Sequence, residues 1–355
     1  MVITSNMVID SLKTNCQDKK ILFYSSDKTK KMFSIKQFYR TDICILRDLG
    51  FKVKLSNSIP DFLLFWQYDF AFIYFYRYGL FPAIIAKLFK KKVIFTGGID
   101  YLEKNYAGYK SYTIQKYFFL LCTFFSDKNI LVSNSDRRNI RNFKSQLPET
   151  KFPLSFHVLN FEEFKFNDIK KKSKLFCTIS WMTRQENVKR KGVDKSLYLF
   201  KKLHDLDNEF RMIIIGTKGE GTKLIEEIII KENLDKLVTL TGSISEHDKI
   251  IILKKSSVYS QLSYYEGFGI AAIEALASGN IVIHTGKGGL MDGIGDNGIL
   301  VEDEDYEKIA LKIKKVLSDP EFHLKMINQG IKHVSENFRY EKRLADFRKI
   351  FSSLL

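Results

Sequence analysis

Short apolar, β-rich runs alternate with helical segments along most of this chain of 355 residues, and that alternation limits the possible folds more than any other feature. In the first half, strands are predicted at residues 20–24, 52–55, 69–75, 93–96 and 130–133. A second series of strands is predicted at residues 175–180, 212–216, 237–242, 257–262, 281–284 and 298–301. Parallel strands need a crossover connection, usually a helix, so each series predicts a parallel sheet covered by helices.

The two series predict two domains of similar size. We expect an α/β protein with two doubly wound, Rossmann-like domains, over residues 1–168 and 169–337. Residues 338–355 are predicted to form a C-terminal helix that packs back toward the first domain. Open sheets of this kind bind ligands beyond the carboxyl ends of their strands, so we expect the two domains to face a cleft that holds the ligand.

The chain carries an excess of basic side chains, with 57 Lys and Arg against 41 Asp and Glu and a formal net charge of +16. Most of the excess lies in residues 1–170, which hold 27 basic and 15 acidic side chains. A positive first half would attract phospholipid headgroups, nucleic acid or a phosphate-bearing substrate. A low-GC codon bias, which favours Lys, Ile, Phe, Tyr and Asn, accounts for the same composition.

Several classes of protein are disfavoured by the remaining composition. The four cysteines form no C-x-x-C pair, which disfavours a zinc ribbon or a redox motif and favours reduced thiols in the cytoplasm. The six histidines show no metal-ligand spacing, and no G-x-x-x-x-G-K-[ST] loop for a nucleoside triphosphate occurs. No secretory signal follows Met1. We therefore expect a cytoplasmic protein without a metal site.

The two most apolar stretches, residues 62–84 and 117–125, do not fit a membrane-spanning helix. Asp69, Arg77 and Gly79 interrupt the first stretch, and the second is short, whereas a spanning helix needs about 20 apolar residues. The aromatic side chains of residues 62–81 are predicted first to belong to core strands. The alternative is that some of these rings, with Arg77 and nearby lysines, rest on a membrane surface.

Residues 263–290 carry the most chemical information. Gly267 and Gly269 permit a tight turn after a strand, a helix is predicted over residues 270–278, and Gly279 is its expected left-handed C-cap. The turn places the start of the helix, with its unpaired backbone N–H groups, at the end of a strand. This geometry is typical of a site for an anionic ligand.

Two carboxylates, Glu266 and Glu274, stand eight positions apart in this segment. The predicted helix is apolar all round, so Glu274 should be buried, where a charge needs hydrogen-bond partners. One hypothesis is that Glu274 accepts two hydroxyls of a ribose. The alternative is that Glu274 pairs with a buried Lys or Arg and Glu266 is a solvated loop residue. In the first hypothesis, a diphosphate or a sugar is bound by the backbone N–H groups of Gly267, Phe268, Gly269 and Ile270.

The string EGFGIAAIE, followed by ALASGNIVI, resembles the E-x7-E motif of retaining GT-B glycosyltransferases (glycosyltransferase family 4), which build lipopolysaccharide, capsule and glycolipids. The order of the surrounding motifs agrees over residues 176–301. The resemblance implies a metal-independent transfer with retention, through front-face attack and an oxocarbenium-like transition state. It implies that Glu274 binds the ribose of the donor and that Glu266 acts at the donor sugar as a catalytic residue.

A basic segment after the first strand of the second series is expected to bind the donor diphosphate. An Arg fork and a Lys charge would stabilise the leaving group there without a metal. By resemblance to the family's pattern, in which an Arg precedes a Lys-Gly pair, Lys191 is the Lys and Arg184 the Arg, with Arg190 as a substitute. The alternative is a solvated basic loop.

The first domain contributes the loop after the strand at residues 93–96. Gly97 and Gly98 permit close approach of the backbone to a ligand. Many members of the family carry a His in this loop, where this chain has Asp100. Asp100 is predicted as a second catalytic residue, which orients the acceptor hydroxyl or contacts the donor sugar; an Asx turn or a helix cap is the alternative. The family's N-terminal glycine loop is replaced by residues 24–34.

These features together predict a retaining hexosyltransferase of bacterial surface polysaccharide synthesis. It would move a hexose from a nucleotide diphosphate sugar to a hydroxyl of a lipid-linked glycan at the cytoplasmic face of the plasma membrane. The expected partners are the sugar nucleotide, the glycan or lipid-linked acceptor and an anionic membrane surface, with no nucleic acid, metal or other cofactor. Two alternatives are a sugar-nucleotide epimerase or hydrolase of the same fold, and a basic binding protein without catalytic activity.

Overall fold

The computed structural model describes residues 18–166 and 173–355. It divides into two compact units, Met1–Val158 with Tyr340–Leu355, and Leu159–Arg339. The predicted change of domain between residues 168 and 169 lies outside the described residues. Helix α8 (Phe161–Phe164) already packs against α13 (Ile270–Ala277), so the chain has entered the second unit before that point.

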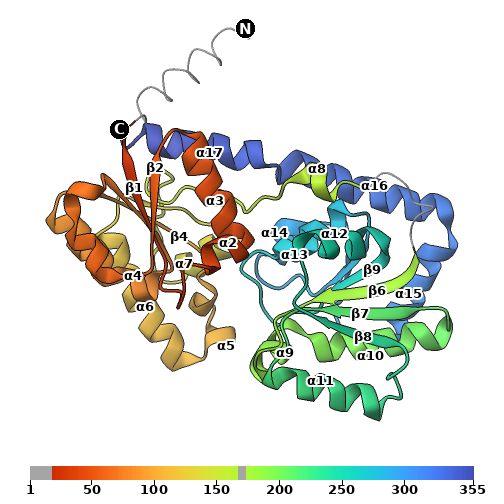
Figure 1. Ribbon diagram of the computed structural model, residues 1–355. Coiled ribbons are helices and arrows are strands. Elements are labelled where there is room, and N and C mark those ends of the chain that lie inside the picture. The colour runs from red at the N-terminus through yellow and green to blue at the C-terminus, as the bar shows by residue number, and fades with distance from the viewer. Residues whose placement is uncertain (1–17, 167–172) are drawn as a thin grey trace, which may run out of the picture. The chain divides into compact units, whose positions relative to one another are not determined.

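Unit 1 is built on a parallel sheet, whose order over the described residues is β2-β1-β3-β4-β5 (Figure 1). Its strands are β1 (Lys20–Tyr24), β2 (Lys52–Ser56), β3 (Phe70–Tyr74), β4 (Lys92–Thr96) and β5 (Lys128–Asn129). Its helices are α2 (Met32–Ile35), α3 (Gln37–Asp48), η1 (Ile59–Leu63), η2 (Phe65–Gln67), α4 (Tyr76–Leu88), η3 (Asp100–Leu102), α5 (Lys104–Ala107), α6 (Tyr109–Phe124), α7 (Asn134–Arg141) and α17 (Tyr340–Ser352).

Two hydrophobic cores cover the two faces of this sheet, because successive side chains of a strand point to opposite sides. Phe70 and Phe72 of β3 pack in the core formed with α3 and α17. Ala71 and Ile73 of the same strand pack in the core formed with α4 and α6. In Figure 1, α4 and α6 accordingly lie on one side of the strands and α3 on the other.

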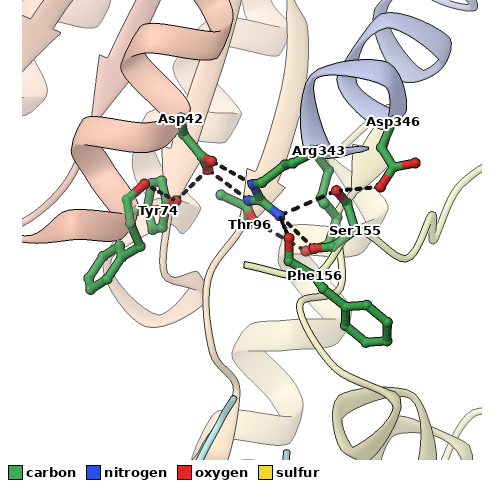
Figure 2. Close-up of polar contacts among 9 residues, drawn as sticks. Asp42, Tyr74, Thr96, Ser155, Phe156, Arg343 and Asp346 are labelled. Carbon is green, nitrogen blue, oxygen red and sulfur yellow. Dashed lines mark hydrogen bonds and ion pairs between the residues drawn. The ribbon is translucent and has the colours of Figure 1, made fainter. Parts of the chain in front are cut away.

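A buried ion pair fastens the C-terminal helix α17 to unit 1 (Figure 2). Arg343 of α17 is 1% exposed, and its guanidinium donates to both carboxylate oxygens of Asp42 on α3, over 2.7 and 2.9 Å. It also donates to the carbonyls of Ser155 and Phe156, while the Tyr74 hydroxyl donates to Asp42. Burial alone would lower the pKa of Arg343, but the Asp42 carboxylate outweighs it and raises that pKa. The ion pair therefore joins three distant parts of the chain.

Unit 2 is built on a second parallel sheet, whose order over the described residues is β11-β10-β9-β6-β7-β8. Its strands are β6 (Ser173–Ile179), β7 (Arg211–Ile215), β8 (Val238–Gly242), β9 (Ser256–Gln261), β10 (Ile281–His284) and β11 (Ile299–Leu300). Besides α8 and α13, its helices are α9 (Gln185–Lys191), α10 (Val193–Leu206), α11 (Glu220–Lys231), α12 (Glu246–Lys255), α14 (Leu290–Ile294), α15 (Tyr306–Ser318) and α16 (Pro320–Asn337).

The prediction of two parallel-sheet α/β domains is confirmed. The predicted strand at residues 130–133 is wrong: the ladder ends at Asn129, and beyond it Leu131 forms an isolated bridge with Leu154. The basic segment before Gly192 is not a loop, because residues 185–191 form the helix α9. Lys36 takes an extended conformation (φ −77°, ψ 117°), which separates α2 from α3.

Candidate functional site

The order of the unit 2 sheet predicts a ligand site beyond β6 and β9. These strands are neighbours, and the chain runs from β6 toward one edge of the sheet and from β9 toward the other. In open parallel sheets, the crevice outside the carboxyl ends at such a reversal is the usual ligand site. Residues 180–184 follow β6 here, and residues 262–266 follow β9.

Glu266 forms the centre of a charged cluster at this point. Its side chain is buried, at 7% exposure, and forms an ion pair with Lys191. Lys191 contacts the Oε1 atom of Glu266. The Arg190 guanidinium lies 3.9 Å from this oxygen, and the Ser263 hydroxyl donates a hydrogen bond to this oxygen over 3.3 Å. Burial alone would raise the pKa of Glu266, but Lys191 and Arg190 outweigh it and hold that pKa below its usual range. Glu266 is therefore an ionised residue of the site and not the solvated loop residue of the alternative.

Gly192 positions the two cations of this cluster. It ends α9 in the left-handed conformation (φ +65°) and connects directly to α10. A Cβ atom at Gly192 would lie 2.0 Å from the Leu262 carbonyl oxygen, so only glycine lets α9 approach the end of β9 this closely. The Tyr264 N–H also donates to the Arg190 carbonyl over 2.8 Å.

We expect Gly192→Ala to lower the melting temperature and to weaken donor binding, because the new methyl group must push the backbone at Leu262 away. Gly242→Ala is the control, since Gly242 has a similar φ of +71° and its Cβ would meet only the flexible Lys218 side chain, at 3.9 Å. Differential scanning calorimetry should show a loss of about 1 kcal/mol for Gly242→Ala and clearly more for Gly192→Ala. Equal losses would contradict the close approach.

Arg184 lies at the other end of α9, where it is the exposed N-cap residue. Its carbonyl packs against Gly221, whose Cβ would lie 2.4 Å from it. Arg190, not Arg184, is thus the arginine that the structure brings to Glu266. Formation of helix α9 explains the difference, because it puts residues 190 and 191 together in its last turn. The predicted role of Arg184 in diphosphate binding stays a prediction.

The start of α13 adjoins this cluster. Gly269, with φ +90°, precedes the helix, whose first internal bond is donated by Ala272 to the Gly269 carbonyl. Phe268 is buried and packs against Phe338 with 5.4 Å between ring centroids, so its side chain belongs to the core. Gly267 and Ile270 are partly exposed at the same end. The backbone here has the geometry that suits an anion or a sugar.

Residues 285–289 brace this backbone from one side. The Gly289 N–H donates to the Glu266 carbonyl over 2.7 Å. A Cβ atom at Gly288, where φ is +67°, would lie 2.1 Å from the same carbonyl. Two glycines of the string TGKGGL therefore fix the backbone of Glu266, which the sequence did not indicate.

Glu274 lies in α13 at 1% exposure and forms an ion pair with Lys249 of α12, over 2.8 Å. Lys249 also pairs with Glu246 over 2.7 Å. Burial alone would lower the pKa of Lys249, but Glu274 and Glu246 outweigh it and raise that pKa. The alternative for Glu274 was that it pairs with a buried Lys or Arg, and Lys249 is a partner of that kind. Binding of a ribose by Glu274 stays a prediction.

Unit 1 has a pocket of about 410 Å³ at its own point of strand reversal, beyond β1 and β3. Its lining residues follow β1, β3 and β4 or come from α6. They are Ser26, Asp27, Phe75, Tyr76, Arg77, Tyr78, Gly98, Ile99, Asp100, Tyr101, Leu102, Gln115 and Phe119. The predicted residues Gly98 and Asp100 thus line a real pocket, and Gly97 (φ +105°) precedes them in the same loop.

Asp27 is a residue of this pocket that the sequence did not reveal. Lys36 pairs with its carboxylate over 2.8 Å, and the Tyr39 hydroxyl donates to it over 2.6 Å. Burial alone would raise the pKa of Asp27, but Lys36 and Tyr39 outweigh it and lower that pKa. The only signal in the sequence was the departure of residues 24–34 from the family's glycine loop.

A second carboxyl group lies behind Asp100. Asp136 of α7 is fully buried and accepts from the Val132 N–H over 3.3 Å, and it also accepts from the backbone of Ile99. Burial, and then the charge of Asp100, raise the pKa of Asp136 well above its usual value. Asp136 therefore ties the start of α7 to the loop that carries Asp100.

Comparisons with known proteins show what the second half of the chain resembles. Residues 160–333 match the family model of the glycosyl transferases group 1. This part of the chain is therefore similar to the group 1 glycosyl transferases. An uncharacterized glycosyltransferase of Methanocaldococcus jannaschii is 30% identical over 243 residues, which cover 67% of this chain and 63% of the relative. The capsular polysaccharide biosynthesis glycosyltransferase CapM of Staphylococcus aureus is 26% identical over 170 residues, which cover 47% of this chain and 44% of CapM.

Solved structures extend the likeness of fold to nearly the whole chain. Anabaena HepE, in complex with UDP and glucose, superposes with a TM-score of 0.74 over 94% of this chain and 100% of HepE, at 14% identity. The fold is that of the GT-B glycosyltransferases, as predicted. The chain spans 63% and 58% of the lengths of two M. jannaschii relatives that it matches.

Proposed function

We propose that this chain is a retaining, metal-independent hexosyltransferase of the E-x7-E type (glycosyltransferase family 4), which uses a nucleoside diphosphate sugar as donor. The observation that carries the proposal is the cluster of Glu266 with Lys191 and Arg190 at the strand reversal of unit 2. The group 1 match over residues 160–333 supports a transferase. The complex of HepE with UDP and glucose supports a donor of this class.

Lys191 and Arg190 act on the diphosphate of the donor in this proposal. Negative charge on the diphosphate grows as the bond to the hexose breaks, and fixed cations stabilise that charge in the transition state. In the free chain both cations face Glu266, and an entering diphosphate becomes their second anionic partner. The backbone N–H groups of residues 267–270 add donors at the positive end of α13.

Glu266 acts on the hexose. Its carboxylate is ionised and held by Lys191, which leaves it able to accept hydroxyl hydrogen bonds on further lone pairs. A negative charge beside the sugar also stabilises an oxocarbenium-like transition state. The donor hydroxyls and the reacting carbon would thus meet Glu266 at the point where the diphosphate meets Lys191.

Glu274 binds the ribose, with Lys249 as its positioning residue. The ion pair keeps Glu274 ionised inside α13, and a carboxylate offers about four acceptor sites, of which one ammonium occupies a part. If the ion pair of Glu274 with Lys249 is purely structural, a change at Glu274 should leave the affinity for the donor unchanged.

We expect Glu274→Gln to weaken donor binding about tenfold to a hundredfold, which is the usual cost of a lost hydrogen bond to a charged group. Glu246→Gln is the matched control, because Glu246 pairs with the same Lys249. Isothermal titration with the donor should show near-normal affinity for the control. If the two variants bind the donor equally well, Glu274 serves the fold alone.

The pocket of unit 1 receives the acceptor. Asp100 and Asp27 offer carboxylates for glycan hydroxyls, and Arg77 offers a cation for a phosphate in a lipid-linked acceptor. The likeness to CapM, a capsular polysaccharide biosynthesis glycosyltransferase, supports a role in bacterial surface polysaccharide synthesis. We propose that this role is carried out at the cytoplasmic face of the plasma membrane.

The proposal is tested by following sugar release from UDP-, GDP-, ADP- and TDP-hexoses with and without a glycan acceptor extract, in the presence of EDTA. A transferase consumes one donor rapidly only with the acceptor, keeps the anomeric configuration and is insensitive to EDTA. Equal consumption without acceptor would indicate a hydrolase or an epimerase and overturn the proposal.

A further inference from the structure

Two neighbouring helices of unit 1 expose large apolar side chains along one stripe each. Helices α4 and α6 pack against each other and share one hydrophobic core, so their outer faces lie on the same side of the sheet (Figure 1). On α4 the exposed apolar side chains are Tyr78, Phe81 and Leu88. On α6 they are Tyr109, Ile114, Tyr117, Leu121 and Phe124.

The spacing of these side chains is that of one helix face. Ile114, Tyr117, Leu121 and Phe124 follow one another at intervals of three, four and three residues, which keeps them in line on a helix. Leu88 is 74% exposed and Phe124 is 79% exposed, so the face is bare and not a half-buried core. A water-exposed apolar face of this extent usually marks an interaction site.

The aromatic surface continues beyond the end of α4. Phe65 of η2 stacks on Phe89, with 4.3 Å between the ring centroids, and Trp66 beside it is 62% exposed. Trp and Tyr side chains favour the boundary between lipid and water, because they join an apolar ring to a polar group.

The charges on the two helices have one sign. Neither α4 nor α6 contains an Asp or a Glu, whereas they carry Arg77, Lys87, Lys110 and Lys116. Three further lysines, residues 90–92, follow α4 directly. Lys87 pairs with Asp127 over 2.5 Å. The surface as a whole is basic and apolar, which matches an anionic lipid surface.

A second copy of the chain fits this surface less well. Two such faces brought together would place lysines and arginines opposite one another, and neither helix has a carboxylate to pair with them. No helix among the described residues has the length and hydropathy to cross a bilayer. An anionic lipid surface offers both the negative charge and the apolar layer that this face matches.

We propose that the outer face of α4 and α6, with Phe65, Trp66 and Phe89, docks this chain on the surface of a bilayer that contains anionic lipid. The same two helices also line the pocket of unit 1, through Arg77 and Tyr78 of α4 and Gln115 of α6. The docked face and the pocket therefore belong to the same two helices, and the link to a lipid-linked acceptor rests on the proposed function.

The proposal is tested by co-sedimentation of the full chain with phosphatidylcholine vesicles, with and without 30% phosphatidylglycerol, at low salt and without sugar nucleotide. We expect the chain to bind the anionic vesicles at least about tenfold more tightly than the pure phosphatidylcholine vesicles, because each basic side chain near the surface contributes about fivefold. Leu88→Glu with Phe124→Glu should abolish this binding. Lys92→Gln with Lys110→Gln should weaken it about tenfold or more.

The matched control is Ile230→Glu, which places the same charge at a 71% exposed apolar position on α11 of unit 2 and should leave vesicle binding unchanged. In a Trp181→Phe background, Trp66 alone remains of the two tryptophans, and its emission should shift to the blue on anionic vesicles. Circular dichroism verifies that the variants are folded.

Three results would overturn the proposal. They are no binding to anionic vesicles, equal binding by the α4–α6 variants and the parent chain, and a lipid-independent dimer that Leu88→Glu with Phe124→Glu dissociates. Because vesicle binding is measured without a donor, its absence would leave the proposed transfer reaction standing. An absence of sugar transfer would likewise leave the docking proposal standing.

Discussion

Lys191→Ala is expected to lower kcat/KM for sugar transfer about a hundredfold to a thousandfold, the range found when one hydrogen-bond donor to a developing anion is removed. Lys191 forms the ion pair with Glu266 and is held in place by the end of α9 at Gly192. Its loss removes a cation from the diphosphate. It also leaves the buried Glu266 carboxylate with Arg190 as its remaining cation at 3.9 Å, so the pKa of Glu266 should rise.

Lys189→Ala is the matched control, because Lys189 is exposed in the same last turn of α9. Steady-state kinetics with the preferred donor should show a change of less than about threefold for this control, as expected for a solvated surface charge. If the two lysine variants lose activity to the same extent, the cluster around Glu266 is not the diphosphate site.

Arg343→Met is expected to destabilise unit 1 by about 3–5 kcal/mol, the usual cost of stranding a buried charge. Figure 2 shows the reason: the guanidinium reaches both oxygens of Asp42 and the carbonyls of Ser155 and Phe156. Without it, the carboxylate of Asp42 stays buried and retains only the Tyr74 hydroxyl among the partners described above. Urea unfolding, with hydrogen exchange of the α3 and α17 amides as the local readout, measures the loss.

Arg339→Met is the control, since Arg339 pairs with Glu162 at the surface, where both side chains are about half exposed. It should cost no more than about 1 kcal/mol. Adding Asp42→Asn to Arg343→Met should recover part of the loss, because a neutral amide no longer leaves a buried charge unpaired. A stability of Arg343→Met within about 1 kcal/mol of the parent chain would show that the ion pair does not fasten α17.

Much of the fold could be predicted because strand and helix patterns are local. The inner strands of both sheets, such as β3 and β9, are short buried runs between helices. Gly279 has the left-handed conformation (φ +74°) expected after α13. The strand after α6 was misjudged because Ile130, Leu131 and Val132 are buried without belonging to the ladder. Burial gives such residues the composition of a strand even where no partner strand continues.

The candidate site was predicted less completely, because its contacts join residues that are far apart in the sequence. Glu266 and Lys191 were identified from their motifs, whereas the choice of Arg190 over Arg184 as the neighbour of Glu266 depends on the helix α9. The partner of Glu274 could not be predicted, since nothing in the sequence marks Lys249 among the many lysines. Asp27 was missed for the same reason, as its partners Lys36 and Tyr39 gather only in the fold.

The exposed faces of α4 and α6 illustrate a different limit. Both helices are apolar enough to look like core segments, and only the packed unit shows which of their side chains remain bare. The sequence left both possibilities open for the aromatic stretch of residues 62–81. The structure shows that each helix buries one side and exposes the other.

Calorimetric titration of the parent chain and of Lys191→Ala with UDP-, GDP-, ADP- and TDP-hexoses tests the central claim most directly, because it measures donor binding at unit 2 without any acceptor. The account predicts saturable binding of one donor to the parent chain and affinity lower by about tenfold or more in the variant. Failure of every donor to bind the parent chain, or equal affinity in the variant, would contradict it.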